Sequence, residues 1–250
     1  MEGSTDPIRD MDTIDLELVM SDMEMVDRRI DKAQEARGQS SHEAEVFQGL
    51  REWLDQGKSA RGYLPQVPED DAALIATSEL LSLKPVIYAA NLDEDGFSDP
   101  EAVPYYRLVE ERAAAQGAQV IPVCAKLEAE IAELDAEEKK MFLDDLGVAE
   151  SGLDRLVKAS YTLLGLISYL TSGEDECRAW TIRRGTKAPQ AAGKIHSDFE
   201  RGFIRAEVVS YDDLMACGSM AAAREKGLIR SEGKEYIVQD GDIILFRFNV

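Results

Sequence analysis

Two short polar segments of the sequence combine residue types that suit ligand binding. Asn91-Leu92-Asp93-Glu94 follows the apolar run 84–90, and Cys124-Ala125-Lys126 ends the apolar run 118–124 and opens a helical pattern. In open parallel sheets, ligands bind beyond the carboxyl ends of the strands, which is where both segments fall. An amide offers a donor and an acceptor, and a carboxylate accepts two N–H donors, so Asn91 and Glu94 suit the edge of a purine base.

The second segment adds a different kind of contact. Small residues at a strand-to-helix turn let backbone N–H groups approach a ligand, and the Lys126 stem can lie along a base. Either segment alone is also typical of an ordinary structural turn. Their occurrence on successive strands with one intervening helix is more specific than either alone.

The elements that must position these segments alternate between helix and strand. The continuous hydrophobicity of 84–90 and 118–124 predicts strands buried on both faces, which is typical of a parallel α/β sheet. Helical patterns cover 72–83, 100–116, 127–134, 135–146 and 153–170.

The N-terminal region predicts two helices joined by a turn at 37–41. Apolar residues spaced by three and four mark the first helix, which we expect to begin near Asp12-Thr13; they are Leu16, Val19, Met23, Val26, Ile30 and Ala33. The second helix, 41–56, carries Ala44, Phe47, Leu50 and Leu54 on one face. The pair predicts a coiled-coil-like antiparallel hairpin, either a protruding arm that contacts a partner or two helices packed inside a domain.

Charge divides the chain unevenly. The 250 residues carry a formal charge of −21, yet residues 172–250 hold 12 basic and 13 acidic side chains, against 16 and 36 in residues 1–171. The later part has strand patterns at 177–183, 202–210, 235–238 and 242–248, typical of a small α+β domain. We predict a helical arm at 1–70, an α/β region at 71–171 and a further domain at 172–250.

Seven basic residues lie between positions 178 and 205, with only two acidic residues among them. With Trp180, Phe199 and Phe203 interleaved, they predict phosphate contacts beside stacking surfaces, as in RNA binding. A solvated basic face above core aromatics is the alternative. The seven are Arg178, Arg183, Arg184, Lys187, Lys194, Arg201 and Arg205.

Taken together, these segments resemble the YchF family of Obg-like ATPases, in the P-loop GTPase superfamily. Related GTPases have NKxD followed by SAK, whereas this chain has Leu92 and Glu94 in an NxxE variant. The resemblance continues through 6–10, 152–156, 178–182, 188–193, 195–200 and 202–208 and covers essentially the whole chain. It implies that Asn91, Leu92, Glu94, Cys124, Ala125 and Lys126 choose the base, and that 172–250 is a TGS domain of the β-grasp class.

One family motif is missing from these residues. A phosphate-binding loop needs GxxxxGK[ST] to cradle phosphates and bind Mg²⁺, and no such segment occurs here. The resemblance therefore implies a C-terminal fragment, without the N-terminal P-loop half. We expect this chain alone to hydrolyse no nucleotide and to bind none tightly, with Mg²⁺ and ATP or GTP as cofactors of the intact protein.

The predicted function is that of an ATP-preferring NTPase fragment which contacts the ribosome or RNA. A stand-alone RNA- or ribosome-binding adaptor with no nucleotide role is the alternative, and a small-ligand regulatory module is a further one. The longest apolar runs, 85–90 and 243–246, are too short to cross a bilayer. The N-terminus shows no secretory signal, so the expected location is the cytoplasm, with no membrane partner.

Overall fold

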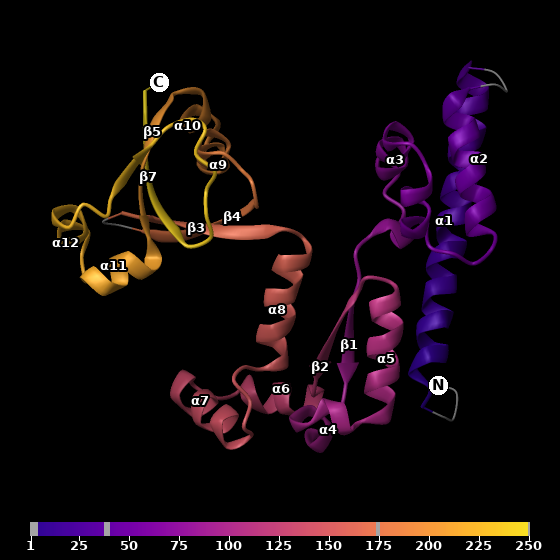
Figure 1. Cartoon of the computed structure of the whole chain (residues 1–250), viewed down its shortest axis with the longest axis horizontal. Coiled ribbons are helices and arrows are strands. Elements are labelled where there is room, and N and C mark those ends of the chain that lie inside the picture. Colours follow the sequence, from indigo (N-terminus) through magenta and orange to yellow (C-terminus); the bar gives the residue numbers. More distant parts are fainter. Residues whose placement is uncertain (1–4, 38–40, 174–175, 250) are drawn as a thin grey trace. The chain divides into compact units, whose positions relative to one another are not determined.

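The two N-terminal helices form the predicted antiparallel hairpin. The computed structural model describes residues 5–37, 41–173 and 176–249, so the predicted turn at 38–40 lies outside the described residues. Helix α1 (Pro7–Arg37) packs along α2 (His42–Leu54) (Figure 1). The Ser41 hydroxyl caps α2 by accepting from the Ala44 N–H at 3.2 Å.

The buried contact between α1 and α2 involves a shorter part of α1 than the sequence pattern predicts. Val19 and Val26 of α1 are buried against α2, but Leu16 is 50% exposed. Because α2 ends at Leu54, it covers only the later part of α1, and α1 itself begins at Pro7 rather than at Asp12. The same cluster takes in Ile75 and Leu80 from the segment that follows.

That segment corrects the predicted helix at 72–83. Three short 3₁₀ turns, Ala60–Gly62, Leu64–Gln66 and Leu81–Leu83, flank a helix, α3 (Glu69–Ala76), that stops seven residues early. The helix does not continue to residue 83, because Glu79 adopts a left-handed φ of 54°. The Asp22 carboxylate then accepts the N–H groups of Leu81 and Ser82, each at 2.7 Å.

The predicted parallel strands are present. Strand β1 (Ile87–Asn91) pairs with β2 (Gln119–Val123), with Asn91 opposite Val123. The connection contains α4 (Glu94–Ser98), a 3₁₀ turn (Pro100–Ala102) and α5 (Pro104–Ala115). Burial on both faces was the wrong prediction, since every residue of β1 keeps partial exposure. The described sheet has two strands here, so both strands are edges.

Three helices follow β2. They are α6 (Ala125–Ile131), α7 (Ala136–Asp145) and α8 (Gly152–Leu163). Asp135 and Glu138 close a capping box at the start of α7, which is the helix that the sequence predicts at 135–146. The predicted helix 153–170 is too long. It ends at Leu163, where Gly165 takes a φ of 62°, and Leu166–Ser172 is a strand.

The second part of the chain is a five-stranded sheet in the order β4-β3-β7-β5-β6. Its strands are β3 (Leu166–Ser172), β4 (Cys177–Arg183), β5 (Phe203–Ser210), β6 (Arg230–Glu232) and β7 (Asp242–Phe248). Three strand predictions are confirmed, whereas 235–238 forms only an isolated bridge from Ile237 to Lys187. The helices are α9 (Ala188–Ile195), α10 (Ser197–Arg201), α11 (Tyr211–Cys217) and α12 (Met220–Glu225).

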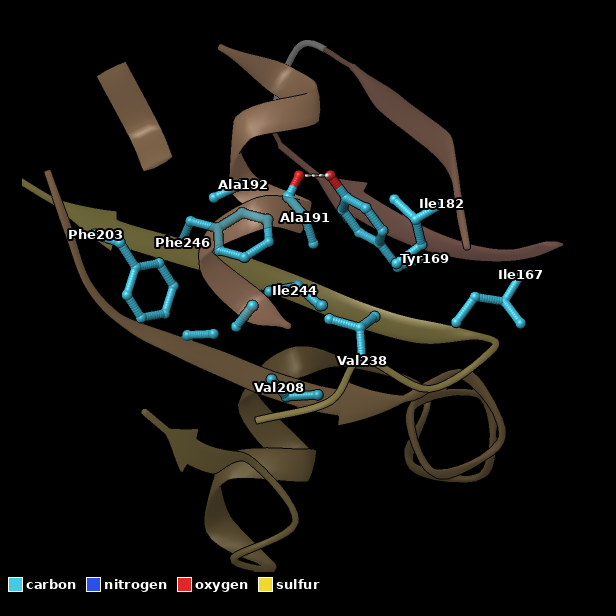
Figure 2. Packing of buried hydrophobic residues seen from close by; sticks show 12 residues of the cluster. Ile167, Tyr169, Ile182, Ala191, Ala192, Phe203, Val208, Val238, Ile244 and Phe246 are labelled. Carbon is cyan, nitrogen blue, oxygen red and sulfur yellow. Dashed lines mark hydrogen bonds between the residues drawn. The ribbon is translucent and has the colours of Figure 1, made fainter. Parts of the chain in front are cut away.

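Helix α9 covers one face of this sheet. Ala191 and Ala192 pack on Tyr169, Phe203 and Phe246, and the Tyr169 hydroxyl donates to the Ala191 carbonyl at 2.8 Å (Figure 2). At one end of the opposite face, α11 and α12 cover Val209 and Ile243. Small alanines let the helix approach the sheet closely, while the aromatic rings fill the core.

The chain divides into two compact units, residues 1–156 and 157–250. Together they give a mixed α/β fold with one parallel and one mixed sheet. The three domains drawn from composition, 1–70, 71–171 and 172–250, remain a prediction, as does the β-grasp assignment. None of the helices in the described ranges is long and apolar enough to cross a membrane.

Candidate functional site

The loops after β1 and β2 are joined by hydrogen bonds. The Asn91 side-chain oxygen accepts from the Ala125 N–H at 3.0 Å, and the Leu92 N–H donates to the Val123 carbonyl at 2.8 Å. Parallel pairing brings both strand ends to one edge of the sheet, as the sequence predicts. Asn91 and Ala125 are exposed, whereas Leu92 is half-buried.

An ion pair spans the same two loops. Lys126 Nζ lies 2.5 Å from Glu94 Oε1, and the Glu94 carboxylate raises the pKa of Lys126. The two side chains are 70% and 48% exposed, so solvent reaches both charged groups. A pair this exposed contributes little to stability. It does hold a cation and a carboxylate at the mouth of the loops, where a ligand can exchange for either partner.

The backbone of the first loop is fixed by a cap. Asp93 accepts from the Gly96 N–H at 2.8 Å and begins α4. A Cβ at Gly96 would lie 2.9 Å from the Asp93 oxygen and 3.0 Å from Val103, so the turn has no room for a side chain there. The cap thereby sets the direction in which Glu94 leaves the strand.

Core packing of one residue holds the second loop in place. Cys124 is buried against Phe97 and Leu127 and offers no side-chain cap to α6. Its buried thiol is a packing group, so the exposed part of this loop consists of Ala125 and Lys126. The structure therefore brings together Asn91, Glu94, Ala125 and Lys126 and places Cys124 beneath them.

A groove beside these loops is absent from the sequence predictions. It has a volume of about 580 Å³ and runs between α1, β1 and α5, with Met11 and Ile14 on one side and Tyr106 and Val109 on the other. Asn91, Leu92 and Asp93 lie at its end. The groove depends on how α1 packs beside β1, more than sixty residues away in sequence, so the motif pattern carried no signal for it.

The basic residues predicted between 178 and 205 lie on several elements. Arg178 sits over the Trp180 ring at 4.2 Å, and five positions on, Arg183 lies on the opposite face of β4. Arg184 follows β4, and Lys194 lies in the last turn of α9. Arg205 is on β5, separated from β4 by two strands. The structure does not bring these seven residues to one surface.

Several of them have acidic partners. Lys187 pairs with Glu235 at 2.5 Å, Arg201 pairs with Asp198, and Arg205 pairs with Glu207 at 2.9 Å. Among the aromatic residues between them, Phe203 is 5% exposed and belongs to the core, whereas Trp180 and Phe199 are partly buried against it. Phe199 stacks on Phe248 with ring centroids 3.8 Å apart. Phe203 is therefore no stacking surface for a base, because the core holds it.

The chain is similar to proteins of one family. Residues 166–249 match the YchF-GTPase_C family, described as "Protein of unknown function (DUF933)". A "Ribosome-binding ATPase YchF" of Bacillus subtilis is 52% identical over 254 residues, covering 100% of this chain and 69% of the relative. One from Haemophilus influenzae is 46% identical over 250 residues, covering 99% and 68%.

A solved structure agrees with these matches. The Schizosaccharomyces pombe YchF GTPase superposes with a TM-score of 0.81 at 32% identity, covering 99% of this chain and 68% of that protein. Its fold therefore extends over nearly all of the chain described above.

Proposed function

The chain belongs to the YchF family of Obg-like ATPases, and from this premise we propose that it supplies the base-selecting loops of an ATP-preferring, ribosome-associated NTPase. The observation that carries the proposal is the pairing of the two loops through Asn91–Ala125 and Glu94–Lys126. Both contacts lie at the carboxyl ends of parallel strands, where nucleotides bind in such sheets. Its relatives are named ribosome-binding ATPases.

The free hydrogen-bonding capacity of the loops fits a purine. Because the Asn91 oxygen already accepts the Ala125 N–H, its amide group retains two N–H donors for a ring nitrogen. The Glu94 carboxylate has further lone pairs that suit an exocyclic amino group. Lys126 stands beside it as a cation with an apolar stem that can lie along the base.

The departures from NKxD favour adenine. Leu92 stands where NKxD has lysine, so the loop lacks that cation and its long side-chain stem. Glu94 stands where NKxD has aspartate and reaches one methylene further, which disfavours the two adjacent N–H donors of guanine. Discrimination of this size is worth about 1–3 kcal/mol. We assign Mg²⁺ and the phosphates to residues outside this chain, since its sequence contains no GxxxxGK[ST] segment. When bound, Mg²⁺ neutralises phosphate charge during hydrolysis.

The base assignment is tested by restoring the GTPase pattern. The subject is this chain extended by the part of the Bacillus subtilis relative that the match leaves out, carrying Leu92→Lys and Glu94→Asp. We expect the ratio of ATP to GTP affinity to fall by about tenfold or more. Lys84→Leu with Glu101→Asp, away from the loops, is the matched control. A ratio unchanged by the loop variant would remove these residues from base selection.

The ribosome assignment has its own test. We expect the 250-residue chain to sediment with salt-washed ribosomes at low ionic strength and to be released as salt rises, because phosphate contacts exchange with counterions. Because we propose that the protein associates with ribosomes, we also place it in the cytoplasm. A chain that stays in the supernatant at all salt concentrations would contradict this part of the proposal.

One observation favours a second candidate, the adaptor without nucleotide. Asn91 and Glu94 are both partnered within the chain, so the loops are complete as ordinary turns. In that case neither this chain nor its extended form would bind ATP, while sedimentation with ribosomes would persist.

A further inference from the structure

Three arginines meet around one carboxylate on the second unit. Arg205 of β5, Arg247 of β7 and Arg224 of α12 all lie within 4 Å of the Glu207 carboxylate, and with Ser231 they line a pocket of about 350 Å³. We call this set the arginine pocket. Only Arg205 among them belongs to the seven basic residues that the sequence marks as binding candidates. Arg224 and Arg247 lie further along the chain.

The strand register makes this cluster costly for the fold. Arg205 is paired directly with Arg247 across β5 and β7, and like charges in that position destabilise a sheet. Glu207 offsets the repulsion, with Oε1 2.9 Å from Arg205 Nη2 and 3.1 Å from Arg247 Nε. Arg224 Nη2 is 3.7 Å from Oε2. One carboxylate thus serves three guanidinium groups. Arg230 also lines the pocket and pairs with Glu232 and Asp242, so the four arginines exceed the three carboxylates by about one positive charge.

The pocket lies on the sheet face opposite the core, beside α12. The neighbours Ala206, Val208 and Phe246 point to the opposite face and are buried in the core. Glu207 is only 13% exposed, whereas Arg205, Arg224 and Arg247 are 50%, 66% and 49% exposed. The arginines lower the pKa of Glu207, so its carboxylate is charged at neutral pH. The Glu207 carboxylate therefore holds the three arginines, while their outer N–H groups remain in solvent.

We propose that the arginine pocket binds a phosphate of a single-stranded RNA backbone; this inference rests on the proposed ribosome association and names its contact. Guanidinium forks match phosphate oxygens in bidentate geometry, and the fixed carboxylate pre-orients them. The exposed side chain of Leu245, opposite Glu207 on β7, offers an apolar surface beside the cations for a sugar or base. In a chain of net charge −21, a local excess of positive charge selects strongly for an anion.

The test measures binding of a fluorescein-labelled oligouridylate of about 12 nucleotides to the 250-residue chain by anisotropy, across a salt series. Arg205→Gln with Arg247→Gln should weaken binding by about tenfold at low salt. It should also flatten the plot of log K against log salt by about 0.7 for each phosphate that the variant no longer neutralises. Lys158→Gln with Lys234→Gln makes the same charge change at two exposed positions elsewhere in this unit and should leave binding within about twofold of wild type.

A second variant distinguishes loss of the binding site from misfolding, because it is expected to increase binding. Glu207→Gln keeps the arginines and removes the competing carboxylate, so it should bind the RNA about fivefold more tightly. Binding unaffected by either pocket variant, or weakened equally by the pocket double variant and the lysine control, would overturn the proposal. So would poly-glutamate competing as well as unlabelled RNA, since that would make the ligand an acidic peptide. Ribosome sedimentation is scored separately, so its failure removes the proposed ribosome association while this assay still decides the pocket.

Discussion

Asp22 joins the helical hairpin to the segment that leads into β1. Its carboxylate is fully buried and accepts the N–H groups of Leu81 and Ser82, each at 2.7 Å. The Ser82 hydroxyl in turn accepts from the Ala60 N–H at 2.9 Å. Replacing Asp22 by alanine would leave two backbone donors without partners beneath the buried side chain of Leu80.

The cost follows from the number and kind of bonds. A hydrogen bond to a charged group contributes about 1.5–3 kcal/mol, so Asp22→Ala should lower the free energy of unfolding by about 3–6 kcal/mol. Asp22→Asn keeps one acceptor and turns an amide group toward the other donor, so it should cost about half as much. Either loss is large against a typical stability of about 5–15 kcal/mol.

Urea unfolding followed by Trp53 fluorescence measures this loss. The variants are made in a Trp180→Phe background, because Trp180 belongs to the second unit and would add its own signal. Asp27→Ala is the matched control: this aspartate lies on the same helix, is 54% exposed and pairs with Arg51 at 2.9 Å. It should cost at most about 1 kcal/mol. An Asp22→Ala loss no larger than that of the control would refute the reasoning.

Two further outcomes are expected in the second unit. Gly202→Ala should destabilise it by about 1–3 kcal/mol in thermal unfolding, because the new Cβ would lie 2.1 Å from the Asn249 carbonyl oxygen; Gly233→Ala, with nothing within 4 Å, should be near neutral. Burial and the Asp242 carboxylate raise the pKa of Tyr236 to about 12. The unfolded chain therefore loses this proton first, and unfolding free energy measured against pH should fall above about pH 10, less so in Tyr236→Phe.

Local patterns predicted the elements that local residues determine. The hairpin, the β1–β2 pair and the capping box at Asp135 follow from spacing, apolar runs and cap residues within a few positions. The apolar runs place both polar segments at the carboxyl ends of parallel strands, and there Asn91 and Ala125 are hydrogen-bonded.

Long-range contacts account for most of what the patterns missed. Helix α3 ends early where Asp22, about sixty residues away, binds the backbone beyond it. Strand β3 continues an apolar helix in sequence, and Gly165 alone marks the change. Local net charge along the sequence does not indicate the arginine pocket, because the sheet register gathers Arg205 and Arg247 from strands about forty residues apart.

Calorimetric titration of ATP and of GTP, each with Mg²⁺, tests the central claim most directly. The subject is the chain extended by the unmatched part of the Bacillus subtilis relative, with the 250-residue chain titrated alongside. We predict that only the extended protein binds, with ATP tighter than GTP by about 5- to 150-fold, which corresponds to about 1–3 kcal/mol. Equal affinity, a preference for GTP, or no binding by the extended protein would contradict the claim.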